Sequence, residues 1–214
     1  MDSLTMLKQL GEGMIVTGEI FFLTLLFALP LGLVIAFGRM AKNPILRTVS
    51  KIYISIMRGT PLMLQLIVFG FGPGLLGIDG MNTFVAVMIA FVLNYACYFS
   101  EIFRGGIEGI PKGQYEAGFV LGMTKSQVFF KVILMQVIKR IIPPMSNEFL
   151  TLVKDTSLAN TIMIYEITWN AKRFMNSAHI LWPLFYSGLF YLAFNGILTL
   201  IFGYIEKKMD YYKS

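Results

Sequence analysis

Cysteine and histidine are almost missing from this sequence. Its 214 residues include one cysteine, Cys97, and one histidine, His179. A single cysteine excludes an internal disulfide, and these two residues make neither a CxxC motif nor a Cys/His metal site. The lack of clustered nucleophiles, bases or metal ligands argues against an enzyme.

A nucleotide-binding loop of the form GxxxxGK[ST] is also absent. The nearest approach is the segment 118–125, in which Met123 and Thr124 separate the second glycine from the lysine. Such a loop cradles phosphates with its backbone amides, so any ATP chemistry must come from a partner. We therefore expect no cofactor in this chain.

Charged residues are scarce, at 14% of the chain, whereas 56% of the residues are hydrophobic and the mean hydropathy is +0.69. A small water-soluble domain cannot hide that much apolar surface, so lipid must be the solvent for much of it. The segment 1–4 lacks the basic region and cleavage site of a signal peptide. The first apolar run is therefore expected to remain as a membrane span.

Apolar runs of about 20 residues predict the membrane spans, because a helix of that length crosses the hydrocarbon core. Five candidates occur: residues 14–38, residues 59–76 with an amphipathic lead-in at 45–57, and residues 82–103, 141–164 and 181–205. The fourth is the hardest to delimit, because Lys139, Arg140 and two prolines interrupt it. The sequence predicts an all-α integral membrane protein with one transmembrane domain over residues 1–214.

Basic residues predict the orientation. Most of them fall in the segments 39–58 and 104–140 and at Lys207, Lys208 and Lys213. Cytoplasmic loops carry the excess of Lys and Arg, so an odd number of spans places the N-terminus outside and the C-terminus in the cytoplasm. This asymmetry accounts for the net charge of +6, and no basic-aromatic motif suggests a nucleic-acid partner.

The connection between the third and fourth spans is about forty residues long, far more than a turn requires. Its middle, from Gln114 to Gly122, follows Pro111 and Gly113 and predicts a short helix. Gly122 ends that helix, and Thr124 can cap the next one. Its one apolar face fits either a groove of another protein or a position on lipid headgroups.

Polar residues within the third span form one helical stripe. Asn94, Tyr98 and Glu101 are spaced by four and three residues. An ionisable group costs roughly 3 kcal/mol or more at the bilayer centre, so it normally faces protein or a water-filled path. Alternatively, Glu101 pairs with Arg104 and only anchors the end of the helix. Gln65 in the second span is a weaker candidate, since one amide can simply join two helices.

The fourth span carries a second polar stripe, made of Glu148, Thr151 and Asp155, with Asn147 and Lys154 nearly on the same face. Such a cluster is not directed toward lipid. An amino acid has an ammonium and a carboxylate that both need partners when it leaves water, and a mixed stripe supplies them. The alternative is a structural network in which Lys154 pairs with Glu148 or Asp155 and holds a dimer together.

Several motifs resemble those of binding-protein-dependent ABC permeases. Glu116-Ala117-Gly118, then Gly122 and Val132-Ile133-Leu134, resemble the EAA signature of the loop that docks on the ATPase subunit. The segments 58–61 (RGTP), 107–114 (IEGIPKGQ) and 154–158 (KDTSL) resemble the polar amino-acid branch of this family. Two positions depart from the signature: Gly118 replaces the usual second Ala, and Met135 replaces a helix-bending Pro, which leaves the path into the fourth span open.

This resemblance implies a permease subunit of a type I importer in a bacterial cell membrane, which moves a polar amino acid by alternating access. It implies four ATPase-docking residues (Glu116, Ala117, Gly118 and Gly122) on a cytoplasmic coupling helix between spans three and four. It also implies ATPase subunits that bind ATP and magnesium, an extracellular or periplasmic binding protein, and a second permease, identical or related. Ser157, in the third of the segments above, joins the candidate substrate path. The competing interpretation is a secondary carrier or channel working alone, for which five spans are few and no inverted repeat is evident.

Overall fold

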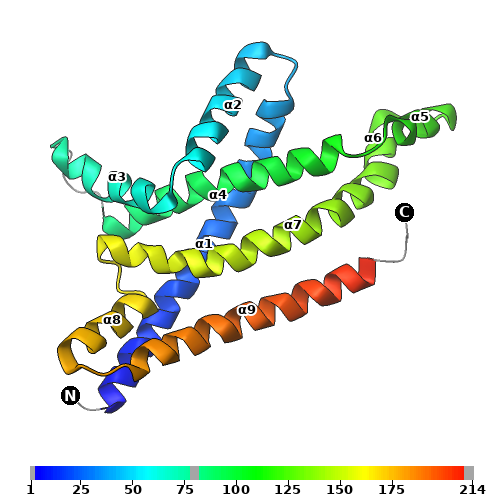
Figure 1. Cartoon of the computed structure of the whole chain (residues 1–214). Helices are drawn as coiled ribbons and strands as arrows, with labels where there is room; N and C mark the ends of the chain where they lie inside the picture. The colour runs from blue at the N-terminus through cyan, green and yellow to red at the C-terminus, as the bar shows by residue number, and fades with distance from the viewer. Residues whose placement is uncertain (1–2, 78–81, 210–214) are drawn as a thin grey trace.

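The computed structural model describes residues 3–77 and 82–209, and every regular element in these two ranges is a helix (Figure 1). Lys213 lies outside them. The elements are α1 (Ser3–Met40), α2 (Pro44–Gly59), α3 (Leu62–Leu75), α4 (Thr83–Glu108), α5 (Lys112–Val120), α6 (Lys125–Val128), the π-helix η1 (Phe129–Ile133), α7 (Leu134–Asp155), the 3₁₀ helix η2 (Thr156–Ile162), α8 (Ile167–Ala178) and α9 (Trp182–Met209).

Three helices in the described ranges are long and apolar enough to cross a membrane: α1 from Leu4, α4 and α9. They correspond to the first, third and fifth predicted spans. The helices α2 and α3 together make a fourth if they are counted as one broken span, since they are bent by 100°. The helix α3 lies within the predicted second span at 59–76, and α2 corresponds to the amphipathic lead-in predicted at 45–57. The sharp angle between them was not predicted.

The helix α7 stands where the fourth span was predicted, with different bounds. It begins at Leu134 rather than near residue 141. Pro143 and Pro144 lie inside the helix and do not mark its start. The π-helix η1 leads into it without a break, which settles the path through Met135. Because of its charged and amide side chains, α7 is less apolar than α1, α4 and α9.

The core lies around α4, which packs against α1. Gly32 of α1 allows this close approach, because a Cβ there would lie 2.9 Å from the Ala96 carbonyl oxygen and from Phe99 Cβ. Phe21 of α1 is buried and packs edge-on against Phe149 of α7 and Phe194 of α9, at ring distances of 6.3 and 5.1 Å. Aromatic packing therefore joins three helices that are far apart in the sequence.

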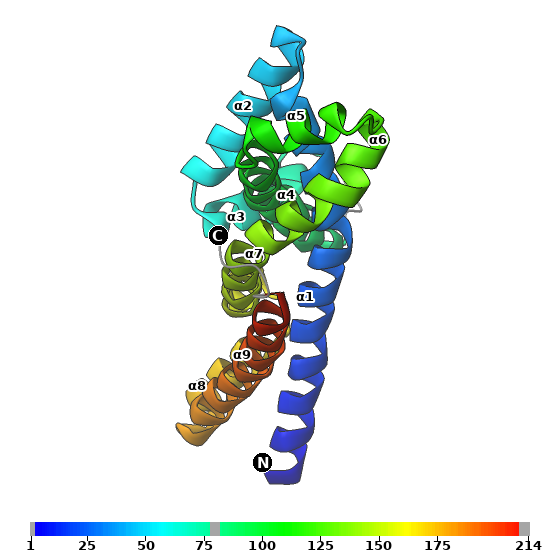
Figure 2. The same ribbon diagram turned by 90° about the vertical axis from the view of Figure 1, so that its right-hand side faces the viewer.

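The short helices α5 and α6 lie at one end of the molecule, beyond the C-terminal end of α4 (Figure 1). Figure 2 shows α1 along the length of the molecule, with α8 and α9 beside its N-terminal half. The predicted turn chemistry between α5 and α6 is confirmed. Gly122 has a positive φ of 73°, and Thr124 forms a capping box with Gln127.

Candidate functional site

A cavity of about 530 Å³ opens between the α2–α3 turn, α4 and the end of α7. Its polar lining comes from both predicted stripes and from the turn: Asn94, Tyr95 and Tyr98 on α4, Glu148, Thr151 and Asp155 on α7, and Arg58 and Thr60 beside the turn. Pro61, Leu62 and Leu158 supply apolar surface. The cavity thus combines one guanidinium and two carboxylates with hydroxyl and amide groups.

The α2–α3 turn exists because Thr60 precedes Pro61. A residue before proline is driven to an extended conformation, and Thr60 has φ −118° and ψ 143°. The break leaves backbone carbonyls without their helical hydrogen-bond donors in an apolar environment, where each unsatisfied carbonyl costs free energy. Gln65 supplies the missing donor. Its Nε2 donates to the carbonyls of Met57 and Thr60 at 2.9 and 3.2 Å and to Thr60 Oγ1 at 2.8 Å.

Asn94 extends this brace to α4. Its Nδ2 donates to Gln65 Oε1 at 3.0 Å and to the Met57 carbonyl at 3.1 Å. Both side chains are buried. Gln65 thus lies behind the cavity wall and fixes the turn, whereas Asn94 reaches the cavity itself.

Tyr95 and Tyr98 connect α4 to the two charged sides of the cavity. The Tyr95 hydroxyl donates to Asp155 Oδ2 at 2.8 Å. The Arg58 guanidinium carbon lies 4.9 Å from the centre of the Tyr98 ring, a cation–π geometry. The two tyrosines therefore orient the Asp155 carboxylate and the Arg58 guanidinium, which both line the cavity.

Glu148 and Asp155 are both partly buried and lie seven residues apart, which places them on one face of α7 two turns from each other. In the described part of the chain, neither forms an ion pair with Lys154, which is exposed. The Thr151 hydroxyl between them donates to the carbonyl of Asn147. The acidic side of the cavity is therefore open to a cationic group of a ligand.

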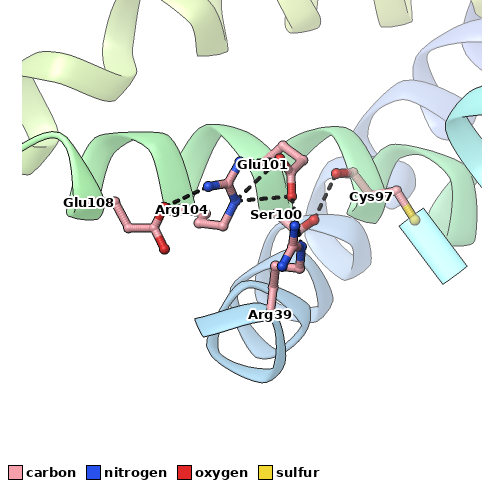
Figure 3. Close-up of polar contacts among 6 residues, drawn as sticks. All are labelled: Arg39, Cys97, Ser100, Glu101, Arg104 and Glu108. Atoms are coloured by element: carbon pink, nitrogen blue, oxygen red, sulfur yellow. Dashed lines mark hydrogen bonds and ion pairs between the residues drawn. The ribbon is translucent and has the colours of Figure 1, made fainter. Parts of the chain in front are cut away.

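Besides Gln65, three candidate path residues do not line this cavity. Asn147 is exposed on α7, and the Ser157 hydroxyl donates to the Lys154 carbonyl. Glu101 lies nearly one turn beyond Tyr98 and accepts from Arg104 Nη2 at 2.5 Å (Figure 3). Arg39 of α1 approaches Glu101 at 4.0 Å. Glu101 therefore belongs to a charged cluster at the ends of α1 and α4.

Among the lining residues that the stripe argument missed are Tyr95 and Arg58. Tyr95 follows Asn94 and lies off the line through Asn94 and Tyr98, but the cavity contacts a wider face of α4. Arg58 was noted only within the basic segment 39–58 and as part of the RGTP motif. The available signal was its position directly before the Gly-Thr-Pro segment, which ends α2.

The residues that the resemblance implies in ATPase docking lie together on α5 and the turn after it. Glu116 and Ala117 are exposed, whereas Gly118 is buried and an added Cβ would lie 2.6 Å from Val128 Cγ2. Gly122 is exposed, with open space around it. Next to it, Val120 and Leu121 are 87% and 80% exposed. Gly118 is therefore needed for packing within the chain. Val120 and Leu121 form an exposed apolar tip at the end of α5.

These observations define a class first: a multi-pass helical membrane protein with a charged cavity between its helices and an exposed short helix at one end. The chain belongs to the family of binding-protein-dependent transport system inner membrane components, whose profile matches residues 28–211.

Named relatives cover nearly the whole chain. The L-cystine transport system permease protein TcyB of Bacillus subtilis is 37% identical over 95% of this chain and 87% of its own length. The arginine transport system permease protein ArtQ of the same organism is 34% identical, over 92% and 91%. The putative glutamine transport system permease protein GlnP of Rickettsia felis is 32% identical, over 92% and 91%.

Solved structures share the fold. A crystal structure of an amino acid ABC transporter with histidines matches at a TM-score of 0.86 and 29% identity, covering 97% of this chain and 99% of that one. An inward-facing MetNI methionine ABC transporter matches at a TM-score of 0.70, covering 98% and 99%. Its identity is only 18%, so it supports the fold alone.

Proposed function

We propose that this chain is the permease subunit of an ATP-driven importer that carries a polar amino acid into the cell. The observation that supports this most directly is the cavity of about 530 Å³ that presents Arg58 together with Glu148 and Asp155. Small-molecule sites are typically about 300 to 1,000 Å³ and orient their ligand with a few convergent polar groups. The named amino-acid permeases among its relatives agree with this substrate class.

The charges of the cavity match those of an amino acid. The substrate ammonium would lie at Glu148 or Asp155, and the substrate carboxylate would lie at Arg58, whose planar guanidinium suits a bidentate contact. Tyr98 holds that guanidinium, and Tyr95 holds the carboxylate of Asp155. In this assignment both charged ends of the substrate exchange water for protein partners inside the membrane.

ATP hydrolysis would be carried out by separate ATPase subunits that bind ATP and magnesium. The tip of α5 supports this part of the proposal, because Glu116 and Ala117 are exposed beside the apolar side chains of Val120 and Leu121. An exposed apolar tip with a polar rim is suited to a groove on a partner. Closure of the ATPases would move α5 and change access to the cavity from one side of the membrane to the other.

The remaining parts of the assembly are proposed from the topology, the charge pattern and the family to which the chain belongs. Five spans, with α7 as the fourth, would place the N-terminus outside and α5 in the cytoplasm. A second permease, a copy of this chain or a related one, would cover polar surface of α7, which membrane helices do not present to lipid. A binding protein outside the cell would deliver the substrate.

Uptake by the purified complex in proteoliposomes tests this function. A panel of labelled amino acids would be supplied outside with ATP enclosed with the ATPases, and with a non-hydrolysable analogue as the control. We expect uptake of a polar amino acid that requires ATP hydrolysis. Equal uptake without ATPase subunits would instead support a carrier or channel working alone.

A further inference from the structure

The charged groups that line the cavity beside the α2–α3 turn do not balance one another. Glu148 and Asp155 supply two carboxylates, and Arg58 supplies one guanidinium, so the lining has a formal charge of minus one. A charge held away from water is costly unless an opposite charge compensates it. The cavity therefore favours a ligand with a net positive charge.

Neither acid forms an ion pair within the described part of the chain. The Asp155 carboxylate accepts the hydrogen bond from Tyr95, and Glu148 has neither a hydrogen bond nor an ion pair there. Lys154 is exposed and lies outside the lining, so its charge acts on Asp155 only through space. The negative charge of the lining is therefore available to a cationic ligand.

The position of Arg58 distinguishes the roles of the two acids. Its charge interacts with that of Glu148. The carboxylate and ammonium of an α-amino acid are on one carbon, so a substrate with its carboxylate at Arg58 would place its α-ammonium at Glu148. Asp155 lies seven residues further along α7, roughly 10.5 Å at the rise of an α-helix. A second acid at that distance suits a second cationic group on the same ligand.

We propose that the cavity carries cationic α-amino acids of the lysine and arginine type, and that Asp155 binds their side-chain cation; this inference rests on the proposed function of the same cavity. The flexible stem of such a side chain separates its two cationic groups and lets each reach one acid. Leu62 and Leu158 offer apolar surface to the methylene groups of the stem. Tyr95 holds the Asp155 carboxylate in place.

Arginine and citrulline provide the sharpest comparison, because they are nearly isosteric and only the arginine side chain is charged. Binding of each would be measured by isothermal titration calorimetry on the purified complex of permease and ATPase subunits in detergent. The binding protein is left out, so that its own selectivity does not enter. We expect arginine to bind about ten-fold more tightly than citrulline, as a charge-assisted contact implies.

Two variants separate the two acids. Asp155→Asn should weaken arginine binding to the level of citrulline and leave citrulline binding nearly unchanged. Glu148→Gln should weaken both ligands by a similar factor and keep their ratio, because it removes the partner of the α-ammonium that both share. Glu12→Gln, at an exposed acid of α1, is the matched control and should change neither affinity.

Equal binding of citrulline and arginine by the wild type would overturn the proposal, as would an unchanged ratio in Asp155→Asn. A wild type that prefers citrulline, together with a Lys154→Gln variant that prefers arginine, would show that Lys154 already neutralises the cavity. In proteoliposomes, ATP-dependent uptake of neutral amino acids alone would reject the cationic class and keep the proposed function. Absence of ATP-dependent uptake for every amino acid would instead reject the proposed function, and this inference with it.

Discussion

The Tyr95 hydroxyl donates a 2.8 Å hydrogen bond to Asp155, and thereby joins the middle of α4 to the last residue of α7. Asp155 is only partly buried, so one side of its carboxylate still faces the cavity. A carboxylate accepts several hydrogen bonds, and the tyrosine uses one of these positions. Asp155 is thus held in place and still available to a ligand.

The two acids of the cavity should therefore each contribute to transport. Glu148→Gln and Asp155→Asn are nearly isosteric, and each removes a charge-assisted partner of an ammonium, worth about 1.5 to 3 kcal/mol. We expect a rise in KM for uptake of at least ten-fold, with intact ATPase binding. If both matter the substrate is cationic, and if only Asp155 matters it is a neutral zwitterion. Glu12→Gln, at an exposed acid of α1, is the matched control, and unchanged uptake in both cavity variants would reject this site.

The brace formed by Gln65 and Asn94 should matter for stability rather than for substrate choice. Gln65→Leu leaves the carbonyls of Met57 and Thr60 without the donor they now have. A buried carbonyl without a hydrogen-bond donor costs about 1 to 3 kcal/mol of stability, so the melting temperature of the purified protein should fall. A double-mutant cycle with Asn94→Leu should show coupling, because the two amides share one network. Additive losses would show that the 3.0 Å contact between them contributes nothing.

The orientation can be tested at Ser126, an exposed residue of α6. Cys97 is buried, so a cysteine at position 126 would be the accessible thiol in a wild-type background. We expect an impermeant thiol reagent to label Ser126→Cys only after the cells are opened, because the α5–α6 region is assigned to the cytoplasm. Labelling in intact cells would reverse the topology. A cysteine at Gln114, on α5, serves as the second position.

Docking on an ATPase should depend on the apolar tip and not on the space at Gly118. Leu121→Asp places a charge on a side chain that is 80% exposed, so it should release the ATPase in co-purification without lowering the melting temperature. Gly118→Val should instead destabilise the chain, because its side chain would collide with Val128, and Val128→Ala should restore stability. A Gly122→Trp variant would be ambiguous, since Gly122 has a positive φ that other residues rarely adopt. Retention of the ATPase by Leu121→Asp would count against this tip.

The long apolar runs made α1, α4 and α9 predictable, because a span needs only length and hydropathy. The bend before α3 was not, although Pro61 marks its place. Its 100° angle depends on Gln65 reaching back to Met57 and forward to Asn94, which is 29 residues further along the chain. A single sequence does not reveal such a pairing.

The candidate site was partly predictable for a related reason. Helical spacing correctly grouped Asn94 with Tyr98, and Glu148 with Asp155, because residues three, four or seven apart share a face. The same spacing also included Glu101, since it gives the face of a residue but not its depth along the helix. In the structure Glu101 lies nearly one turn past the cavity, where Arg39 and Arg104 meet it.

Glu166 should show a dependence of stability on pH. Its side chain is fully buried and caps α8, accepting from the backbone amides of Thr168 and Trp169 at 2.8 and 2.7 Å and from the Tyr191 hydroxyl at 3.1 Å. Burial raises the pKa of this carboxyl above its ordinary value, despite the hydrogen bonds that oppose the shift. An acid with a raised folded-state pKa stabilises the fold below its unfolded pKa, and this contribution is lost as pH rises through the folded pKa.

The neutral variant Glu166→Gln keeps the shape of the side chain and one of its two acceptor oxygens, and it does not titrate. The melting temperature of the wild type relative to this variant should therefore increase as pH is lowered from 7 toward 5, measured in detergent. Glu166→Ala should be less stable than both at every pH, since loss of an N-cap typically costs about 1 kcal/mol. A difference between wild type and Glu166→Gln that stays constant with pH would show that the hydrogen bonds of the cap offset its burial, so that the carboxyl titrates as it does in the unfolded chain.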